Sequence, residues 1–549
     1  MRSVQIRWRI GLLLLTLIVI SVNAQNSELG TVHFPTSGSE KAQAHFLRGL
    51  AALHSFWFEE ALEAFRESTR IEPDFMMGYW GEAMAQNHPL WSEQDTPAAR
   101  LVIAKIKETP KLRPRERAYL NAVKLLYGEG DKRARDLAYS TAMEKIYRDY
   151  PDDLDAAAFY SLSLLGLVQT SDKSYRLQAR AGAIALDVYQ KNPNHPGAAH
   201  YIIHAFDDPD HAILALPAAR RYAGIAPEAH HARHMPSHIF LQLGMWPEAA
   251  ASNESAWEAS DTWMKRKHLS PNVRDYHSLH WLLYVYLQQG RYSKAEELLM
   301  QMKKTMSETT YDNKLRPGYY ENNYANMAAA FVVETERWEL AATLFPQSAV
   351  VAQTSAGTPA MDSHGGHGAS QPAPGGALTV RSSSAAQRLP HFVRGLAASL
   401  SGSAAKEPAM DEGNPQTSIN ELEIAAASAS VKKDHDRAIE LMKKAIALEE
   451  QMGPPTGPPG LIKPSNELFG EILLRAGKPE AAAEQFRTAL LRQPNRARSL
   501  LGLARAAARS GDPRGAASAY ARLSEQWQLA DKGLPELREA LDYLKQAKR

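Results

Sequence analysis

The sequence predicts an all-α protein, a superhelix (solenoid) of stacked helix-turn-helix units that is interrupted by one flexible segment rich in Gly, Ser, Ala and Pro. Three observations predict this fold. Small residues, aromatic residues and prolines recur at a fixed spacing, weaker copies of the same pattern fill the interval, and the composition suits a large soluble core. The chain has 549 residues, of which 44% are hydrophobic and 23% charged, which is enough for two or more domains.

The repeat pattern is clearest near the two ends of the chain. Counted from Ala42 and from Lys463, both stretches place two small residues, an aromatic residue, a third small residue and a proline in the same slots of a unit of about 34 residues. These residues are Gly49, Ala61, Phe65, Ser68 and Pro73 in the first unit and Gly470, Ala482, Phe486, Ala489 and Pro494 in the second. A following unit offers Ala504, Ala516 and Tyr520. The spacing resembles that of tetratricopeptide repeats.

Each slot has a physical role. Gly or Ala in the first two slots lets two antiparallel helices approach closely, the aromatic side chain fills the gap to the next unit, and proline closes the second helix. One pair of helices cannot bury its apolar face alone, so the units must stack. Weaker copies occur in "LGMWPEAAASNESAWEA", "LQQGRYSKAEELL" and "KDHDRAIELMKKAIAL", which extends the predicted superhelix over most of the chain.

A low-complexity segment divides the predicted repeats. Residues 352–417 contain "TSAGTPAMDSHGGHGASQPAPGGALTVRSSSAA", which lacks the aliphatic residues needed to offset the entropy of ordering. Within this linker, "QRLPHFVRGLAASLSG" predicts one short amphipathic helix that docks on the superhelix. The linker thereby separates an N-terminal repeat domain over residues 25–351 from C-terminal repeats over residues 418–549.

The first residues predict export. A basic start is followed by the apolar run Ile10 to Ile20 and by "SVNAQ", in which a signal peptidase can cut after Ala24. We therefore interpret residues 1–24 as a cleaved signal peptide and expect a secreted or periplasmic protein. The alternative is an uncleaved anchor, but the run is shorter than the roughly 20 residues that span a bilayer. No other stretch is long and apolar enough to span, so we expect no transmembrane segment in the mature chain.

Charge and motifs exclude several classes of function. Removal of the three arginines in residues 1–24 changes the net charge from +2 to −1, so there is no electrostatic reason to expect a nucleic-acid partner. The sequence has no Gly-x-Ser-x-Gly elbow and no Walker phosphate loop. Its lack of cysteine excludes disulfides and a thiol nucleophile. Any chemistry would therefore have to depend on a metal.

Histidines gather in one part of the chain. Of 19 histidines, 11 lie between His195 and His280, and this enrichment needs a local cause. In "NHPGAAHYIIHAFDD", Pro196 suits the first position of a helix, from which His200 and His204 then project four residues apart. Two imidazoles at that spacing can reach the same ion.

Two further stretches add to this set. "APEAHHARHM" predicts a long turn, after which Pro236 begins a helix, so His234 lies just outside that helix and His238 just inside it. "DYHSLHW" places His277 and His280 near the start of another helix. First helices of stacked pairs line the concave face and are successive neighbours there, so we expect one shared centre. The candidate ligands are His200, His204, His234, His238, His277 and His280, with His195, His231 and Asp207 as second choices.

The nature of this centre stays open at the level of sequence. Imidazoles without a thiolate suit one divalent transition metal such as zinc, copper or iron, whereas the alternative is hydrogen-bonded packing between helices. Aromatic and polar side chains in "PLW" and "GYYENN" could line the same concavity as a binding surface, or could belong to ordinary repeat packing. These residues are Trp91, Tyr319, Tyr320, Glu321 and Asn323.

The central motif resembles the signature of an exported bacterial family of tetratricopeptide-repeat proteins. It reads "HPGAAHYIIHAFDDPDHAILALPAARRYAGIAPEAHHARHMPSHIFLQLGMW", and the resemblance implies the repeat fold but no established activity. Two functions follow as hypotheses. The first is an exported scaffold that binds a protein or peptide on its concave face. The alternative is a metal-dependent enzyme, hydrolytic or oxidative, in which Asp207, Asp208 or Glu321 acts as base.

Overall fold

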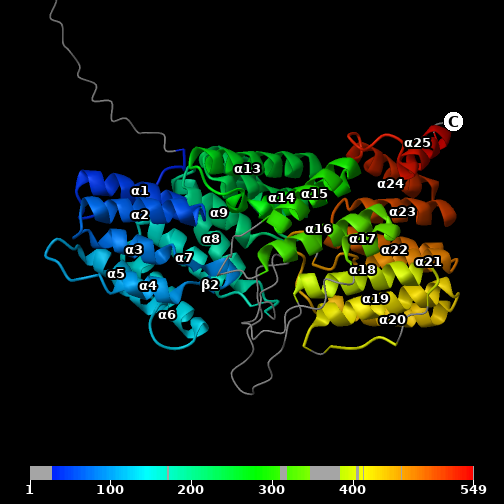
Figure 1. Ribbon diagram of the computed structural model, residues 1–549, viewed down its shortest axis with the longest axis horizontal. Helices are drawn as coiled ribbons and strands as arrows, with labels where there is room; N and C mark the ends of the chain where they lie inside the picture. Colours follow the sequence, from blue (N-terminus) through cyan, green and yellow to red (C-terminus); the bar gives the residue numbers. More distant parts are fainter. Residues whose placement is uncertain are drawn as a thin grey trace, which may run out of the picture.

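Stacked helices run the whole length of the protein in the computed structural model, from the blue N-terminal end to the red C-terminal end of Figure 1. The structure describes residues 28–169, 172–308, 318–346, 384–403, 407–411, 413–458 and 460–547. Within these ranges the only strands are β1 (Asn87–His88) and β2 (Glu93–Gln94), which pair antiparallel. The predicted all-α class is confirmed.

The N-terminal third is a continuous series of helical pairs. It comprises α1 (Glu40–His54), α2 (Phe58–Ile71), α3 (Met76–Met84), η1 (Pro89–Trp91), α4 (Thr96–Ile103), α5 (Pro114–Leu126), α6 (Lys132–Asp149), α7 (Leu154–Gly166) and α8 (Arg176–Lys191). The aromatic slot works as predicted, because Phe65 fills the space left by two glycines. A Cβ atom at Gly49 would lie 2.9 Å from the Phe65 ring, and one at Gly81 would lie 2.3 Å from it.

The middle of the chain carries most of the predicted ligands. Its helices are α9 (Pro196–Ala205), α10 (Ala212–Ile225), α11 (His230–His234), α12 (Pro236–Gln242), α13 (Trp246–Arg266), η2 (Pro271–Val273), α14 (Tyr276–Gln288), α15 (Tyr292–Glu308), α16 (Tyr319–Thr335), η3 (Trp338–Leu340) and α17 (Ala341–Leu344). Figure 1 shows α13 and α14 side by side near the middle of the molecule, and these two helices are in contact.

The long turn predicted for residues 226–235 is wrong in its second half. The chain is already helical from His230, and Met235, with φ −54° and ψ −35°, continues that conformation into α12. Pro236 is tolerated there because the first position of a helix needs no donor and the fixed φ of proline is already helical. His234 and His238 are therefore four residues apart along nearly continuous helical backbone.

The C-terminal third repeats the same construction. It contains α18 (Ala385–Leu400), α19 (Pro415–Val431), α20 (His435–Glu449), α21 (Ser465–Arg475), α22 (Pro479–Arg492), α23 (Ala497–Arg509), α24 (Pro513–Gln526) and α25 (Pro535–Ala547). Phe486 fills the space beside Gly470 and Gly502, where added Cβ atoms would lie 2.7 and 2.2 Å from its ring. The predicted slots are thus occupied in the same way at both ends of the chain.

The linker prediction can be compared with the structure only in part. The predicted helix is α18, which packs between α16 and α19 and buries Leu389, Phe392 and Leu396. The signal peptide predicted over 1–24 and most of the low-complexity stretch lie outside the described residues. No helix in the part of the chain that the structure describes is both long and apolar enough to cross a membrane.

Candidate metal centre

Four helices bring six histidines into the interior of the superhelix. Helix α9 supplies His200 and His204, α11 supplies His231 and His234, α12 supplies His238 and α14 supplies His277. The start of α9 is fixed by His195, whose Nδ1 accepts a hydrogen bond of 3.1 Å from the backbone N–H of Ala198. Helix α9 contacts α10 and α12, and α13 contacts α11, α12 and α14. The six imidazoles divide into two groups of three.

Triad A consists of His200, His204 and His231. One ring nitrogen of each lies within 4.8 Å of the other two. The Nε2 atoms of His200 and His204 are 3.0 Å apart, and the ring centroids of His200 and His231 are 5.1 Å apart. Nε2 of His231 is buried and has no hydrogen-bond partner among the described residues. Three ring nitrogens therefore converge on one point.

The tautomer of His200 is set by the backbone. Its Nδ1 lies 2.7 Å from the carbonyl oxygen of His54, and a carbonyl can only accept, so Nδ1 carries the proton. Neutral His200 consequently presents the lone pair of Nε2 to His204. A protonated Nδ1 bonded to a carbonyl is the arrangement that orients imidazoles as metal ligands.

Triad B consists of His234, His238 and His277, and it also holds one ring nitrogen from each member within 4.8 Å of the others. The Nε2 atoms of His234 and His238 are 3.1 Å apart. The ring of His277 lies 4.4 Å from that of His234, measured between centroids. Triad B thus repeats the geometry of triad A, with an i, i+4 pair joined by a third ring.

Both tautomers in the His234–His238 pair are determined by acceptors. Nδ1 of His238 lies 2.6 Å from the carboxylate of Asp207. Nδ1 of His234 lies 2.6 Å from Oδ1 of Asn253, and Asn253 Nδ2 donates to the carbonyl of Ala249 at 2.9 Å, which fixes the amide orientation. Both Nδ1 atoms therefore carry protons, and two Nε2 lone pairs face each other at 3.1 Å. That contact is favourable only if a proton or a cation lies between them.

Burial favours the neutral, metal-binding form of these rings. Desolvation lowers the pKa of His234 below its ordinary value and lowers that of His231 well below it. A neutral imidazole is the form that binds a metal ion. The geometry and the burial therefore support the same chemistry.

The two triads adjoin each other. Ring centroids are 5.9 Å apart between His231 and His234 and 5.8 Å apart between His204 and His238. The sequence predicted one shared set of ligands, and the structure places these histidines in two neighbouring groups of three. His280, predicted as a ligand, belongs to neither triad. It lines a separate small cavity of about 10 Å³ together with Tyr284 and Glu334.

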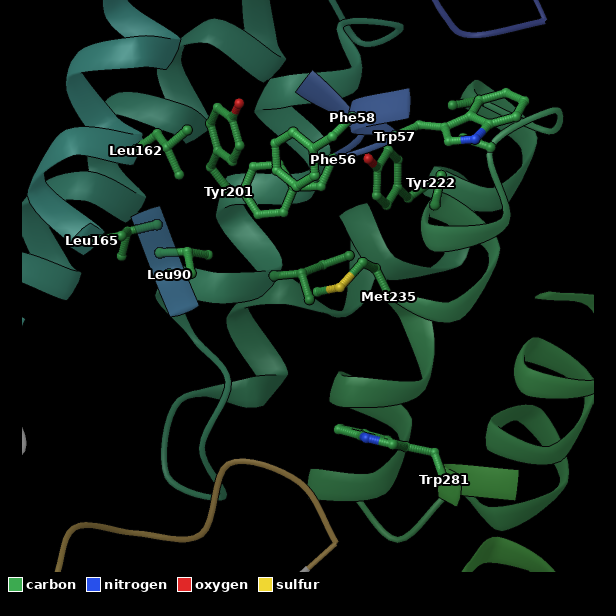
Figure 2. Close-up of a cluster of buried hydrophobic side chains, with 14 of the residues drawn as sticks. Phe56, Trp57, Phe58, Leu90, Leu162, Leu165, Tyr201, Tyr222, Met235 and Trp281 are labelled. Carbon is green, nitrogen blue, oxygen red and sulfur yellow. The ribbon is translucent and has the colours of Figure 1, made fainter. Parts of the chain in front are cut away.

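Aromatic rings enclose the six histidines, and Figure 2 shows Phe56, Tyr222, Met235 and Trp281 among the buried side chains of this region. The Phe56 ring lies 4.3 Å from the ring of His200, and the Trp281 ring lies 4.1 Å from that of His238. A Cβ atom at Gly457 would lie 2.8 Å from Trp281. The loop before α21 therefore closes over this side of the centre.

The comparisons with known proteins identify the repeats. Models of the tetratricopeptide repeat match residues 42–75 and 468–530. The chain contains tetratricopeptide repeats. The matched segments include most of the two units predicted from Ala42 and Lys463, so that part of the sequence analysis is confirmed. Superhelices of such repeats usually offer concave surfaces to partners. The repeats therefore suggest, as a general role for this tetratricopeptide-repeat protein, a scaffold for protein interactions.

Similarity to solved structures is found only at low identity and low TM-score. The crystal structure of the APC/C hetero-tetramer Cut9-Hcn1 covers 93% of this chain and 76% of its own, with 10% identity and a TM-score of 0.34. That of yeast Tom70 covers 91% and 87%, with 11% identity and a TM-score of 0.23. A comparison with curated protein sequences finds no match. Values this low support no inference about function, which must come from the site itself.

A third buried group underlies triad A. Nε2 of His54 lies 2.9 Å from Oδ1 of Asp155, and Nε2 of His195 lies 3.4 Å from the same oxygen. Hydrogen bonds to the two histidines hold the pKa of Asp155 below its usual range, against the opposing effect of burial. This group contains the second-choice ligand His195. Because the carbonyl of His54 also accepts from His200, the group positions triad A.

The predicted binding surface is not a single patch. Trp91 lies 5.9 Å from the ring of His231, between centroids, and so belongs to the wall of triad A. Tyr320 and Asn323 are buried in α16, where Tyr320 donates to the carbonyl of Asn272 at 2.7 Å and Asn323 donates to the carbonyl of Tyr319 at 2.8 Å. Glu321 is exposed. Ordinary packing thus accounts for Tyr320 and Asn323.

Proposed function

We propose that this tetratricopeptide-repeat protein binds transition-metal ions inside its superhelix, at triad A and at triad B. The observation that carries the proposal is the 3.1 Å approach of two Nε2 atoms whose rings both have Nδ1 committed to an acceptor. In neutral imidazoles this leaves two lone pairs in contact, and a shared cation removes their repulsion. Ligand nitrogens about 3 Å apart suit an ion bound at about 2.0–2.1 Å from each.

The donor set limits the metal. Each triad offers three neutral nitrogens, and Asp207, the nearest acid to triad B in hydrogen-bonding terms, is already bonded to Nδ1 of His238. All-imidazole sites suit zinc and copper, whereas carboxylate-rich sites suit magnesium, calcium and manganese. Of the predicted metals, zinc and copper therefore fit best, because paired iron sites in helical proteins use several glutamates. Three ligands also leave a coordination position open.

Export belongs to the same proposal. The basic start, the apolar run and the small residues before Gln25 support a protein that is secreted or periplasmic. In that setting the concave face of the repeats would serve a protein or peptide partner, while the metal sites stabilise the interior. Detection of the mature N-terminus at Gln25 in the exported fraction would test the location separately.

Elemental analysis tests metal binding directly. Full-length mature protein purified without a histidine tag, and dialysed against a weak chelator, should retain close to two equivalents of metal per chain. A His234→Ala/His238→Ala variant should retain about one. The matched control is His280→Ala, which removes a buried histidine of α14 outside both triads and should retain both ions. A protein that neither retains nor takes up zinc or copper would overturn the proposal.

A further inference from the structure

Triads A and B are close enough to act together. Resting on the proposed function, we infer that they form one dinuclear copper centre, in which the two ions share a bridging oxygen ligand derived from water. The inference concerns nuclearity and ligand class, neither of which follows from metal binding alone. It depends on how the two triads are joined, on the donors around them and on access from solvent.

Helix α11 joins the triads. It supplies His231 to triad A and His234 to triad B, and residues three apart are neighbours on one helix face. Their ring centroids are 5.9 Å apart. Across the same boundary the rings of His204 and His238 are 5.8 Å apart. The ring contacts between the triads are therefore comparable with the separation of 5.1 Å between His200 and His231 within triad A.

Among the described residues, neither triad includes a carboxylate. The two oxygens of Asp207 are bonded to His238 and to Gln242, at 2.6 and 3.1 Å, and Asp275 is bonded to Nδ1 of His230 at 3.1 Å. An ion held by three imidazoles would therefore have an open position. A water molecule bound there loses a proton to solvent more readily than bulk water does, because the ion stabilises hydroxide. Its oxygen can then bind both ions, with the O–H bond broken and the proton released.

Residual exposure differs among the six histidines. His200 and His234 are fully buried, whereas the other four members of the triads keep slight exposure. The values are 6% for His204, 7% for His231, 4% for His238 and 8% for His277. These four residues are therefore not completely sealed from solvent, and the rings of Trp91 and Trp281 lie beside those of His231 and His238.

The donors favour copper over zinc for such a pair. Copper binds nitrogen donors more tightly than the other divalent ions of the first row do. Two sets of three imidazoles with no thiolate and no bridging carboxylate give each ion neutral ligands only. A bridging hydroxide then supplies the negative charge that two adjacent cations require, since their mutual repulsion is strong in a poorly solvated interior.

Spin counting on the copper-loaded protein tests the inference. Full-length apoprotein is given two equivalents of Cu(II) alone, and the integrated electron paramagnetic resonance signal is compared with total copper. An oxygen bridge pairs the two unpaired electrons, so we expect a signal several-fold smaller than the copper content predicts. Two retained Cu(II) ions with full signal intensity would overturn the dinuclear centre while leaving the proposed function intact.

Single-triad variants supply the second measurement. His204→Ala removes a ligand of triad A, and His277→Ala removes one of triad B; each should hold about one equivalent of copper and show the full signal of an isolated ion. His280→Ala should keep two ions and the weak signal of the native protein. Circular dichroism checks that each variant is folded. Because the two variants alter different triads, the test stays decisive if one of them unfolds. A single-triad variant with one ion and a weak signal would also contradict the inference.

Discussion

The carboxylate of Asp207 accepts from Nδ1 of His238 at 2.6 Å, and this contact links the residues that follow α9 to the face of α12 that carries triad B. The same carboxylate accepts from Gln242, which also donates to the carbonyl of Pro455 at 2.7 Å. A chain of hydrogen bonds therefore runs from the C-terminal half of the protein to a ring nitrogen of triad B. Carboxylate–histidine pairs of this kind orient the ring and raise its basicity as a ligand.

Replacement of this carboxylate should weaken one triad only. In Asp207→Asn, a neutral amide oxygen replaces the carboxylate as acceptor for Nδ1–H of His238, and this hydrogen bond becomes weaker. The dissociation constant for metal at triad B should therefore rise about 10–100-fold. Triad A should be unchanged. Competition with a chromophoric chelator would resolve the two sites as one weakened and one native affinity.

The neighbouring aspartate provides the control. Asp208 bonds to His211, at 2.8 Å from Nδ1, and His211 belongs to neither triad. Asp208→Asn should therefore leave both affinities within a factor of about two of the native values, since hydrogen bonds outside a metal site do not tune it. Equal weakening by both substitutions would show that Asp207 acts through general stability.

Metal should also stabilise the folded chain. A ligand that binds only the native state adds about 2.7 kcal/mol to the free energy of unfolding when its free concentration is 100 times the dissociation constant. Each triad should contribute such an increment, because its ligands come from helices that separate on unfolding. Thermal melts with copper and with excess chelator would measure it. An unchanged midpoint in the native protein would contradict the prediction, and His204→Ala should lose only part of the shift.

The repeats could be predicted because their signal is local. Gly49 and Phe65, or Gly470 and Phe486, lie within one unit, and the contact that explains them is a short-range property of two helices. The spacing of His200 and His204 is local in the same sense. Periodicity therefore predicted the fold and the approach of these two imidazoles, whose Nε2 atoms lie 3.0 Å apart.

The rest of the site depends on contacts between distant residues. His54 is 146 positions from His200, and no feature of "AALHSFW" indicates that its carbonyl will bond to that ring. Asn253 lies within an ordinary repeat helix and gave no signal either. His277 belongs to triad B and His280 does not, although residues three apart can lie on one face of a helix. The rotation of α14 about its own axis decides which of the two rings faces the triad. Helix rotation in the packed core decides such questions, and the sequence alone does not specify it.

The contact between the two halves of the protein should depend on a buried arginine. Arg496 is fully buried and lies 2.7 Å from Glu467 and 2.6 Å from Glu334, and it also donates to the hydroxyl of Tyr284 at 3.0 Å. Arg496→Ala leaves Glu334 buried without its ion-pair partner and leaves Glu467 with Lys463 alone, at 3.0 Å. Breaking a buried pair in this way should cost about 3–5 kcal/mol. Denaturant unfolding should show the loss as an earlier transition of the C-terminal repeats.

A half-exposed arginine gives the matched comparison. Arg505 pairs with Glu539 at 2.7 Å, and the two side chains are 37% and 35% exposed. Because exposed ion pairs contribute only about 0–1 kcal/mol, Arg505→Ala should shift the same transition little. A comparable loss in both variants would mean that the buried network does not hold the two halves together.

The pH dependence of stability should include a contribution from His280. Desolvation by burial lowers its pKa from 6.5 to about 4, so the unfolded chain takes up a proton at this position at a higher pH than the folded chain does. The sign follows from linkage: stability is fully present above pH 6.5 and falls as the pH drops toward about 4. Since one pKa unit corresponds to about 1.4 kcal/mol, the loss should approach about 3 kcal/mol.

His280→Leu isolates this contribution because leucine has a similar volume and no titrating group. In the presence of a chelator, so that the triads are free of metal in both proteins, the free energy of unfolding is measured from pH 7 to pH 4. The native protein should lose about 3 kcal/mol more than the variant over this range. Parallel profiles would contradict this prediction, because they would show that His280 gains a proton in the folded state without cost. Since His280 is buried beside Tyr284 and Glu334, that result would require an ionised Glu334 paired with the protonated ring.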